Sequence, residues 1–142
     1  MSFLKAKYDV AKNLHLTISI IILIPIALAY GVHPNIVLSK FFDFKADTID
    51  LKNIFRALMG LYSAMVIIWA IGIIKPKFWA TATITNIVFM GGLALGRLIS
   101  LALDGLPTIY FSIGLILELA LAAWGLKNLK KYGLNFTEKT VA

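Results

Sequence analysis

The stretch IFRALMGLYSAMVIIWAIGIIKPKFWATATITNIVFMGGLALGRLISLAL, residues 54–103, is mostly apolar on both sides of a short Lys-Pro-Lys break. Each side has about 20 or more residues, which is the length that a helix needs to cross a bilayer. Pro76 has no amide hydrogen with which to continue a helix. The stretch therefore predicts two membrane-spanning helices, at about 54–74 and 78–103, joined by a tight turn.

Two more segments of this kind lie outside it, at about 14–31 and 107–126. Pro107 follows the short Asp104–Leu106 connection and suits the first turn of a helix. The sequence thus predicts an all-α protein: a single domain over residues 1–142, folded as a four-helix transmembrane bundle. We expect the longer connection 32–53, which mixes aromatic and charged residues, to lie along the membrane interface. Thr48 and Asp50 can cap the helix that follows it.

The overall composition agrees with a membrane protein. The chain is 60% hydrophobic and 15% charged, with a mean hydropathy of +0.86. A soluble domain has about 45–50% apolar and about 25% charged residues. The net charge of +7 lies mainly beside the apolar segments, so we expect a lipid bilayer and no nucleic acid as the partner. The chain has no cysteine, which rules out disulfides and thiol chemistry within it.

The basic residues also predict the orientation in the membrane, because lysine and arginine gather on the cytoplasmic side. One side of the four-span model carries most lysines: Lys5, Lys7, Lys12, Lys75, Lys77, Lys127, Lys130, Lys131 and Lys139. The other side has Lys40, Lys45 and Lys52, balanced by Asp43, Asp47 and Asp50, and then Asp104. We therefore expect both termini in the cytoplasm.

Aromatic residues fit this orientation, since Trp79 and Trp124 fall at the cytoplasmic interface, and Tyr30 and Tyr110 near the outer one. An alternative makes the first apolar segment a cleaved signal peptide. The long, partly acidic stretch before this segment favours a retained helix instead.

A polar stripe runs along the third span. Asn86, Arg97 and Asp104 fall within about 20° of one another at about 100° per residue. Gly92 and Gly96 form a small-xxx-small pair that admits a neighbouring helix. The stripe has two interpretations: a packing seam with an arginine that snorkels to the headgroups, or a buried polar site.

Glu118 lies near the centre of the fourth span, where a charge costs about 2.5–3.5 kcal/mol. Gly114 and Ala122 flank it one turn away, so we expect this carboxylate to face the bundle interior. Counted from the Asp104–Pro107 turn, Arg97 and Glu118 differ in depth by roughly 7 Å. An arginine side chain can bridge most of that distance, and an ion pair between the two remains an open hypothesis.

Further polar residues have weaker signals. Arg56 shares a face with Gly60 and is close enough to the outer surface to snorkel. Tyr62 can donate a hydrogen bond into the bundle or pack there. His15 and His33 are about 27 Å apart by helical rise and cannot share a metal, so we expect both at the interfaces.

The sequence contains none of the short catalytic or metal-binding motifs that carry a mechanism. We therefore assign no catalytic residue, no metal and no cofactor. The candidate ligand-binding residues are Arg56, Tyr62, Asn86, Arg97, Asp104 and Glu118. The candidate helix-packing residues are Gly60, Gly92, Gly96 and Gly114.

Three stretches together resemble a known family: FRALMGLYSAM at 55–65, FMGGLALGRLISLALDGLP at 89–107 and ELALAAWGL at 118–126. The chain resembles a bacterial family of small four-span membrane proteins known only as a domain of unknown function, which are loosely similar to DoxX-like four-helix proteins. The family's characteristic positions map to Arg56, Gly60, Tyr62, Gly92, Gly96, Arg97, Asp104, Gly105, Pro107 and Glu118. The resemblance implies the four-helix fold and the bacterial inner membrane, and it implies no activity.

Three classes of function remain open. The leading hypothesis is a non-enzymatic membrane protein that binds a lipid-like or anionic small ligand, or acts as a subunit of a membrane assembly. The second is a small transporter or proton-coupled carrier with Glu118 as the titrating group. The third is a membrane enzyme that uses Glu118 as acid–base and Arg97 as electrophile. The glycine pairs also predict a homodimer or homotrimer.

Overall fold

The computed structural model describes residues 2–42 and 44–133; Asp43 and Lys139, which entered the orientation argument, lie outside them. The described residues are helical with short connections and contain no strand. The helices are α1 (Ser2–Gly31), α2 (Pro34–Phe41), α3 (Ile49–Ile74), the 3₁₀ turn η1 (Pro76–Phe78), α4 (Trp79–Asp104) and α5 (Ile109–Tyr132). Within this part of the chain four helices are long and apolar enough to cross a membrane. The predicted all-α bundle is confirmed.

The helix ends follow from local chemistry. Thr48 is the N-cap of α3, where its hydroxyl accepts a hydrogen bond from the Leu51 amide at 3.2 Å, as the sequence predicted. The Lys-Pro-Lys break forms η1, in which the Phe78 amide bonds to the Lys75 carbonyl at 2.9 Å. At the end of α4, Gly105 has φ of 93°, a backbone conformation that favours glycine. The connection 32–53 differs from a plain loop, because it contains α2.

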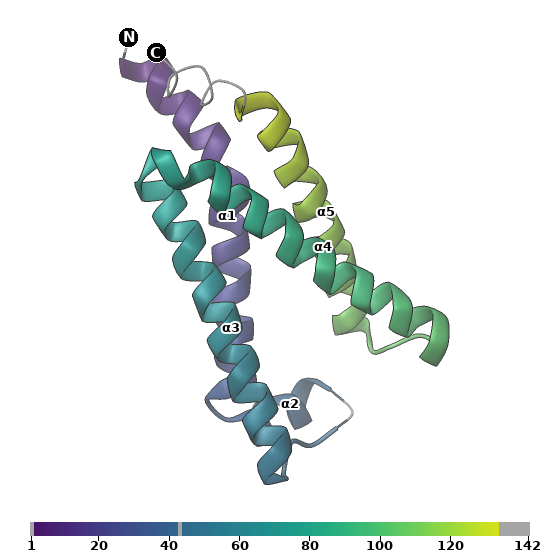
Figure 1. The fold of residues 1–142 in the computed structure, drawn as a ribbon. Coiled ribbons are helices and arrows are strands. Elements are labelled where there is room, and N and C mark those ends of the chain that lie inside the picture. The colour runs from purple at the N-terminus through teal and green to yellow at the C-terminus, as the bar shows by residue number, and fades with distance from the viewer. Residues whose placement is uncertain (1, 43, 134–142) are drawn as a thin grey trace.

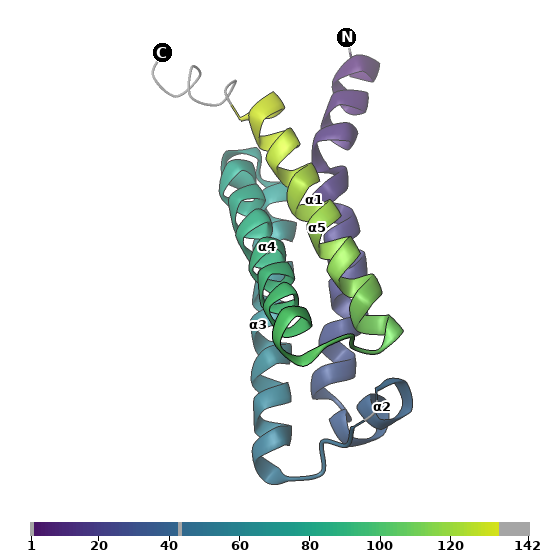
Figure 2. The same cartoon turned by 90° about the vertical axis from the view of Figure 1, so that its right-hand side faces the viewer.

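The four long helices form two pairs, α1 with α3 and α4 with α5, linked through η1. The first turns of α1 and the last turns of α5 lie at one end of the molecule, which we call the terminal end (Figures 1 and 2). The two pairs diverge toward the opposite end, where α2 lies; we call this the α2 end (Figure 1). A cavity lies between the two pairs toward this end.

Apolar side chains cover both the inside and the outside of this bundle. Trp69, Trp79 and Leu16 are fully buried between the helices. Large apolar residues such as Ile21, Ile67 and Val88 are more than half exposed, which suits contact with lipid rather than water. The chain is a small multi-pass membrane protein.

Candidate ligand cavity

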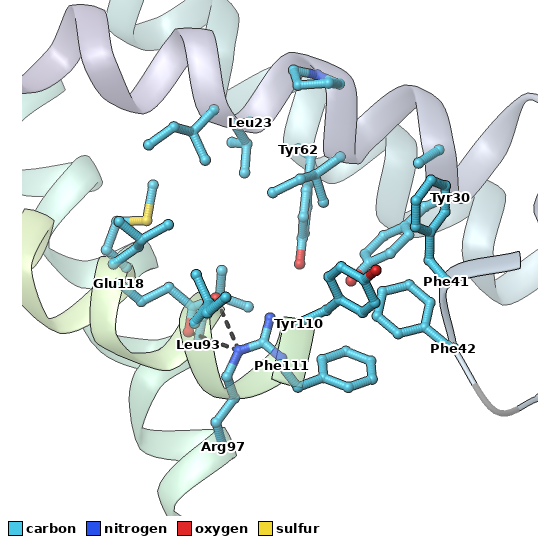
Figure 3. A pocket seen from close by; sticks show the side chains of 18 of the residues that line it. Leu23, Tyr30, Phe41, Phe42, Tyr62, Leu93, Arg97, Tyr110, Phe111 and Glu118 are labelled. Atoms are coloured by element: carbon cyan, nitrogen blue, oxygen red, sulfur yellow. Dashed lines mark hydrogen bonds and ion pairs between the residues drawn. The ribbon is translucent and has the colours of Figure 1, made fainter. Parts of the chain in front are cut away.

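A cavity of about 430 Å³ lies between the helix pairs toward the α2 end, and all five helices line it (Figure 3). Its volume falls in the range of about 300–1,000 Å³ that small-molecule sites occupy. Leu23, Met90 and Leu121 close it toward the terminal end, and each of these side chains is buried. The cavity therefore has an apolar floor.

The polar centre of the cavity is an ion pair between α4 and α5. Arg97 donates from Nε to both carboxylate oxygens of Glu118, at 3.0 Å to Oε1 and 2.8 Å to Oε2. The side chain of Glu118 is 10% exposed and that of Arg97 24%. The open hypothesis is thus resolved in favour of pairing: Arg97 reaches inward to a carboxylate rather than outward to the headgroups.

One face of α5 provides a surface against which this arginine lies. Phe111, Gly114 and Glu118 are spaced by three and four residues, so they lie above one another on the helix. The Arg97 guanidinium carbon lies 5.1 Å from the centre of the Phe111 ring, a cation–π contact. A Cβ placed on Gly114 would be 3.6 Å from Arg97 Cζ and Nη2. A side chain larger than alanine at this position would push the guanidinium aside.

Two tyrosines face the ion pair from the other helix pair. Tyr30 on α1 and Tyr62 on α3 pack against each other, with ring centres 5.7 Å apart, and both are within electrostatic reach of Arg97. Figure 3 shows the Tyr62 hydroxyl pointing into the cavity on the side of Arg97. The cavity thus joins apolar walls to a compact set of hydrogen-bonding groups.

Aromatic side chains at the C-terminal end of α2, namely Phe41 and the C-cap residue Phe42, meet α5 at the cavity wall. Phe42 stacks on Phe111 with ring centres 4.5 Å apart, and Phe41 meets Tyr110 edge-on at 5.8 Å. The connection that the sequence placed along the membrane interface therefore contributes directly to the cavity.

The electrostatics of the site favour an oxygen-bearing ligand. Glu118 and Arg97 cancel each other's charge, so the site as a whole is neutral. Both hydrogen bonds to Glu118 use Nε of Arg97, and the terminal nitrogens of the guanidinium are further donors. A neutral or anionic head with acceptor oxygens suits these donors, whereas a cationic head does not.

The structure brings together some of the sequence-predicted residues and separates others. Arg97, Glu118, Tyr62 and Gly114 line the cavity. Among the described residues, three candidates lie outside the lining of this cavity: Arg56 is exposed on α3, Asn86 is fully buried one turn beyond Met90, and Asp104 is exposed and accepts a hydrogen bond from Ser100.

Three packing glycines face outward instead of toward the cavity. Gly60, Gly92 and Gly96 are exposed, and a Cβ on any of them would meet nothing within 4 Å in the described chain. Close approaches between helices occur at other glycines: a Cβ on Gly72 would collide with Ala82, and one on Gly125 would lie 2.7 Å from Ile87. The sequence does not distinguish inward-facing from outward-facing glycines, because apolar residues lie on every face of each span.

Sequence reasoning missed Tyr30 and Phe111 as cavity residues. The signal for Phe111 was its spacing of seven residues from Glu118, which places both on one helical face. His15 and Trp79, which the sequence placed at the interfaces, have side chains that are fully buried among the helices. His15 Nδ1 lies 2.9 Å from Nδ2 of Asn128 on α5, and the His15 and Trp79 rings meet edge-on at 6.2 Å. Asn128 thus gives the His15 imidazole a polar contact inside the bundle.

The described residues contain no group of three or more His, Cys, Asp or Glu side chains that could hold a metal ion. In the comparison with known proteins, residues 11–127 match a family model described as a domain of unknown function (DUF4345). No curated protein and no solved structure matches the chain.

Proposed function

The chain belongs to the family described as a domain of unknown function (DUF4345), and we propose that it is a non-enzymatic membrane protein that binds a lipid-like ligand in the cavity between its helix pairs. The ligand's apolar part would lie against the apolar walls. Its head, carrying acceptor oxygens, would accept hydrogen bonds from Arg97. The single observation that carries the proposal is an apolar cavity of about 430 Å³ with the Arg97–Glu118 pair as its charged centre.

The apolar floor supports binding over transport. A carrier that uses Glu118 needs access to this carboxylate from both sides of the membrane, and Leu23, Met90 and Leu121 stand between it and the terminal end.

We place the protein in the bacterial inner membrane with both termini in the cytoplasm. The resemblance to bacterial, loosely DoxX-like four-helix proteins supports the membrane. The gathering of lysines beside the terminal ends of the spans supports the orientation.

The ligand proposal is testable by photolabelling in lipid nanodiscs. The probe is a long-chain fatty acid with a photoreactive group near its tail. We expect it to label peptides of α1 and α5 that line the cavity, and oleyl alcohol to compete while oleylamine does not. Arg97→Gln/Glu118→Gln, which removes both charges and leaves neither unpaired, should lower the labelling about tenfold. Arg56→Gln, an exposed arginine outside the cavity, is the matched control and should label as the wild type does.

Two outcomes would contradict the proposal. One is labelling spread evenly over the lipid-facing surface of all four spans. The other is equal labelling of the wild type and the double variant, since the head would then have no contact with the ion pair.

We also propose self-association through α4, as a dimer or trimer. Gly92 and Gly96 are one turn apart, exposed, and open to a neighbouring helix. Gly92→Leu/Gly96→Leu should then shift the protein toward monomer in native mass spectrometry from mild detergent. A monomeric wild type under the same conditions would count against this assembly.

A further inference from the structure

A second hollow, of about 600 Å³, lies between α1 and α5 at the terminal end, away from the ligand cavity. Figure 2 shows the two helices diverging there. We call it the terminal groove and define it by Ala11 and Leu14 on α1 and by Ala123, Trp124, Lys127, Asn128, Lys131 and Tyr132 on α5.

The groove is basic on one side. Lys127 and Lys131 are exposed and lie one turn apart on α5, a spacing at which like charges repel. The Lys131 amine lies 5.1 Å from the centre of the Tyr132 ring, next to the groove. Among the described lining residues none is acidic. The one acid in the α5 sequence is Glu118, which lies about 13 Å from Lys127 by helical rise. This carboxylate is already paired with Arg97. An anion would relieve the repulsion between the two lysines.

The other side of the groove is apolar. Ala11 and Leu14 on α1 line it, and Leu14 is 39% exposed. Val10, at 65% exposed, and Leu126, at 48%, are exposed apolar residues next in sequence to the groove residues Ala11 and Lys127. Trp124 lines the groove one turn before Lys127 on α5, and an indole suits the level of lipid headgroups.

From this arrangement we propose that the terminal groove binds an anionic phospholipid. Its phosphate lies between Lys127 and Lys131, its glycerol region lies against Trp124, and an acyl chain follows the apolar wall toward Leu14. Basic hollows between membrane helices are suited to such lipids. A soluble phosphate would use the lysines and leave the apolar wall without a role. The site does not depend on the ligand cavity, which lies toward the opposite end.

The test is a lipid titration of the detergent-solubilised protein, followed by native mass spectrometry. The probes are phosphatidylglycerol and phosphatidylcholine with identical acyl chains. We expect the first phosphatidylglycerol to bind about tenfold more tightly than phosphatidylcholine. Lys127→Gln/Lys131→Gln should remove most of this preference, and Lys127→Arg/Lys131→Arg should keep it. Each lysine is exposed, so the variants should fold, and their thermal midpoints verify this.

Lys75→Gln/Lys77→Gln is the matched control. It removes the same charge at the same end of the molecule, from exposed lysines in and beside η1 that do not line the groove. It should leave the phosphatidylglycerol preference within about twofold of the wild type. If both double variants lost the phosphatidylglycerol preference equally, the proposal would be overturned, because the preference would then reflect net charge. Equal binding of the two lipids by the wild type would also overturn it, as would displacement of phosphatidylglycerol by millimolar inorganic phosphate.

Discussion

At the scale of single residues, Arg97 and Glu118 belong together for energetic reasons. A charge inside a span costs several kcal/mol unless it is paired, and an arginine cannot escape the cost by losing its proton. The ion pair at 2.8 Å lowers this cost for both residues. The guanidinium also lies against Phe111 and Gly114 on α5. Both bonds to Glu118 use Nε, so the terminal guanidinium nitrogens are further donors, with Tyr30 also within reach of Arg97.

This pairing predicts a strongly coupled double-mutant cycle. Glu118→Gln should destabilise the protein, because it leaves a permanent charge unpaired. Arg97→Gln should destabilise it less, because Glu118 can take up a proton. The double variant should cost about 1–3 kcal/mol less than the sum of the single changes. Thermal unfolding of all four proteins in detergent measures this, and additive costs would show that the residues act independently.

At the scale of helices, each span could be predicted, but the direction in which it faces could not. The apolar length, the Lys-Pro-Lys break and the Thr48 cap are local signals, and each appears in the structure. In a soluble helix the polar face marks the outside. Here lipid-facing and buried faces are both apolar, so Gly72 and Gly60 look equivalent in the sequence although one faces Ala82 and the other open space. The cavity could not be predicted from the sequence either, because it depends on how the two helix pairs diverge.

These two glycines on α3 give a direct test of helix orientation. Gly72→Ala should destabilise the protein by about 1–3 kcal/mol, because the new methyl group collides with Ala82 at the α3–α4 contact. Gly60→Ala should be neutral or stabilising by about 0.5–1 kcal/mol, because alanine favours the helix and meets no neighbour. Unfolding of both variants in the same detergent compares them. If Gly60→Ala destabilised the protein more than Gly72→Ala does, the orientation assigned to α3 would be wrong.

At the scale of the whole molecule, the two ends differ in chemistry. The terminal end carries Lys75, Lys77, Lys127 and Lys131, and the α2 end carries the cavity and its aromatic wall. If the terminal end faces the cytoplasm, the cavity lies nearer to the outer leaflet.

The orientation can be read from single cysteines, because the chain has none of its own. A cysteine replacing Asn35, exposed on α2, should react with an impermeant thiol reagent in intact cells. A cysteine replacing Lys77, exposed in η1, should react only after the membrane is opened. The reverse pattern would invert the topology.

The central claim, that the cavity holds a lipid-like molecule, is tested most directly by native mass spectrometry of protein extracted gently from its own membrane. We expect a single copurifying amphiphile per chain in the wild type. Ala29→Phe, which fills the cavity from α1, should lose it, and Ala120→Phe, at an exposed position outside the cavity lining, should retain it. A wild-type protein that carries no such molecule, or an Ala29→Phe protein that carries it equally well, would contradict the account.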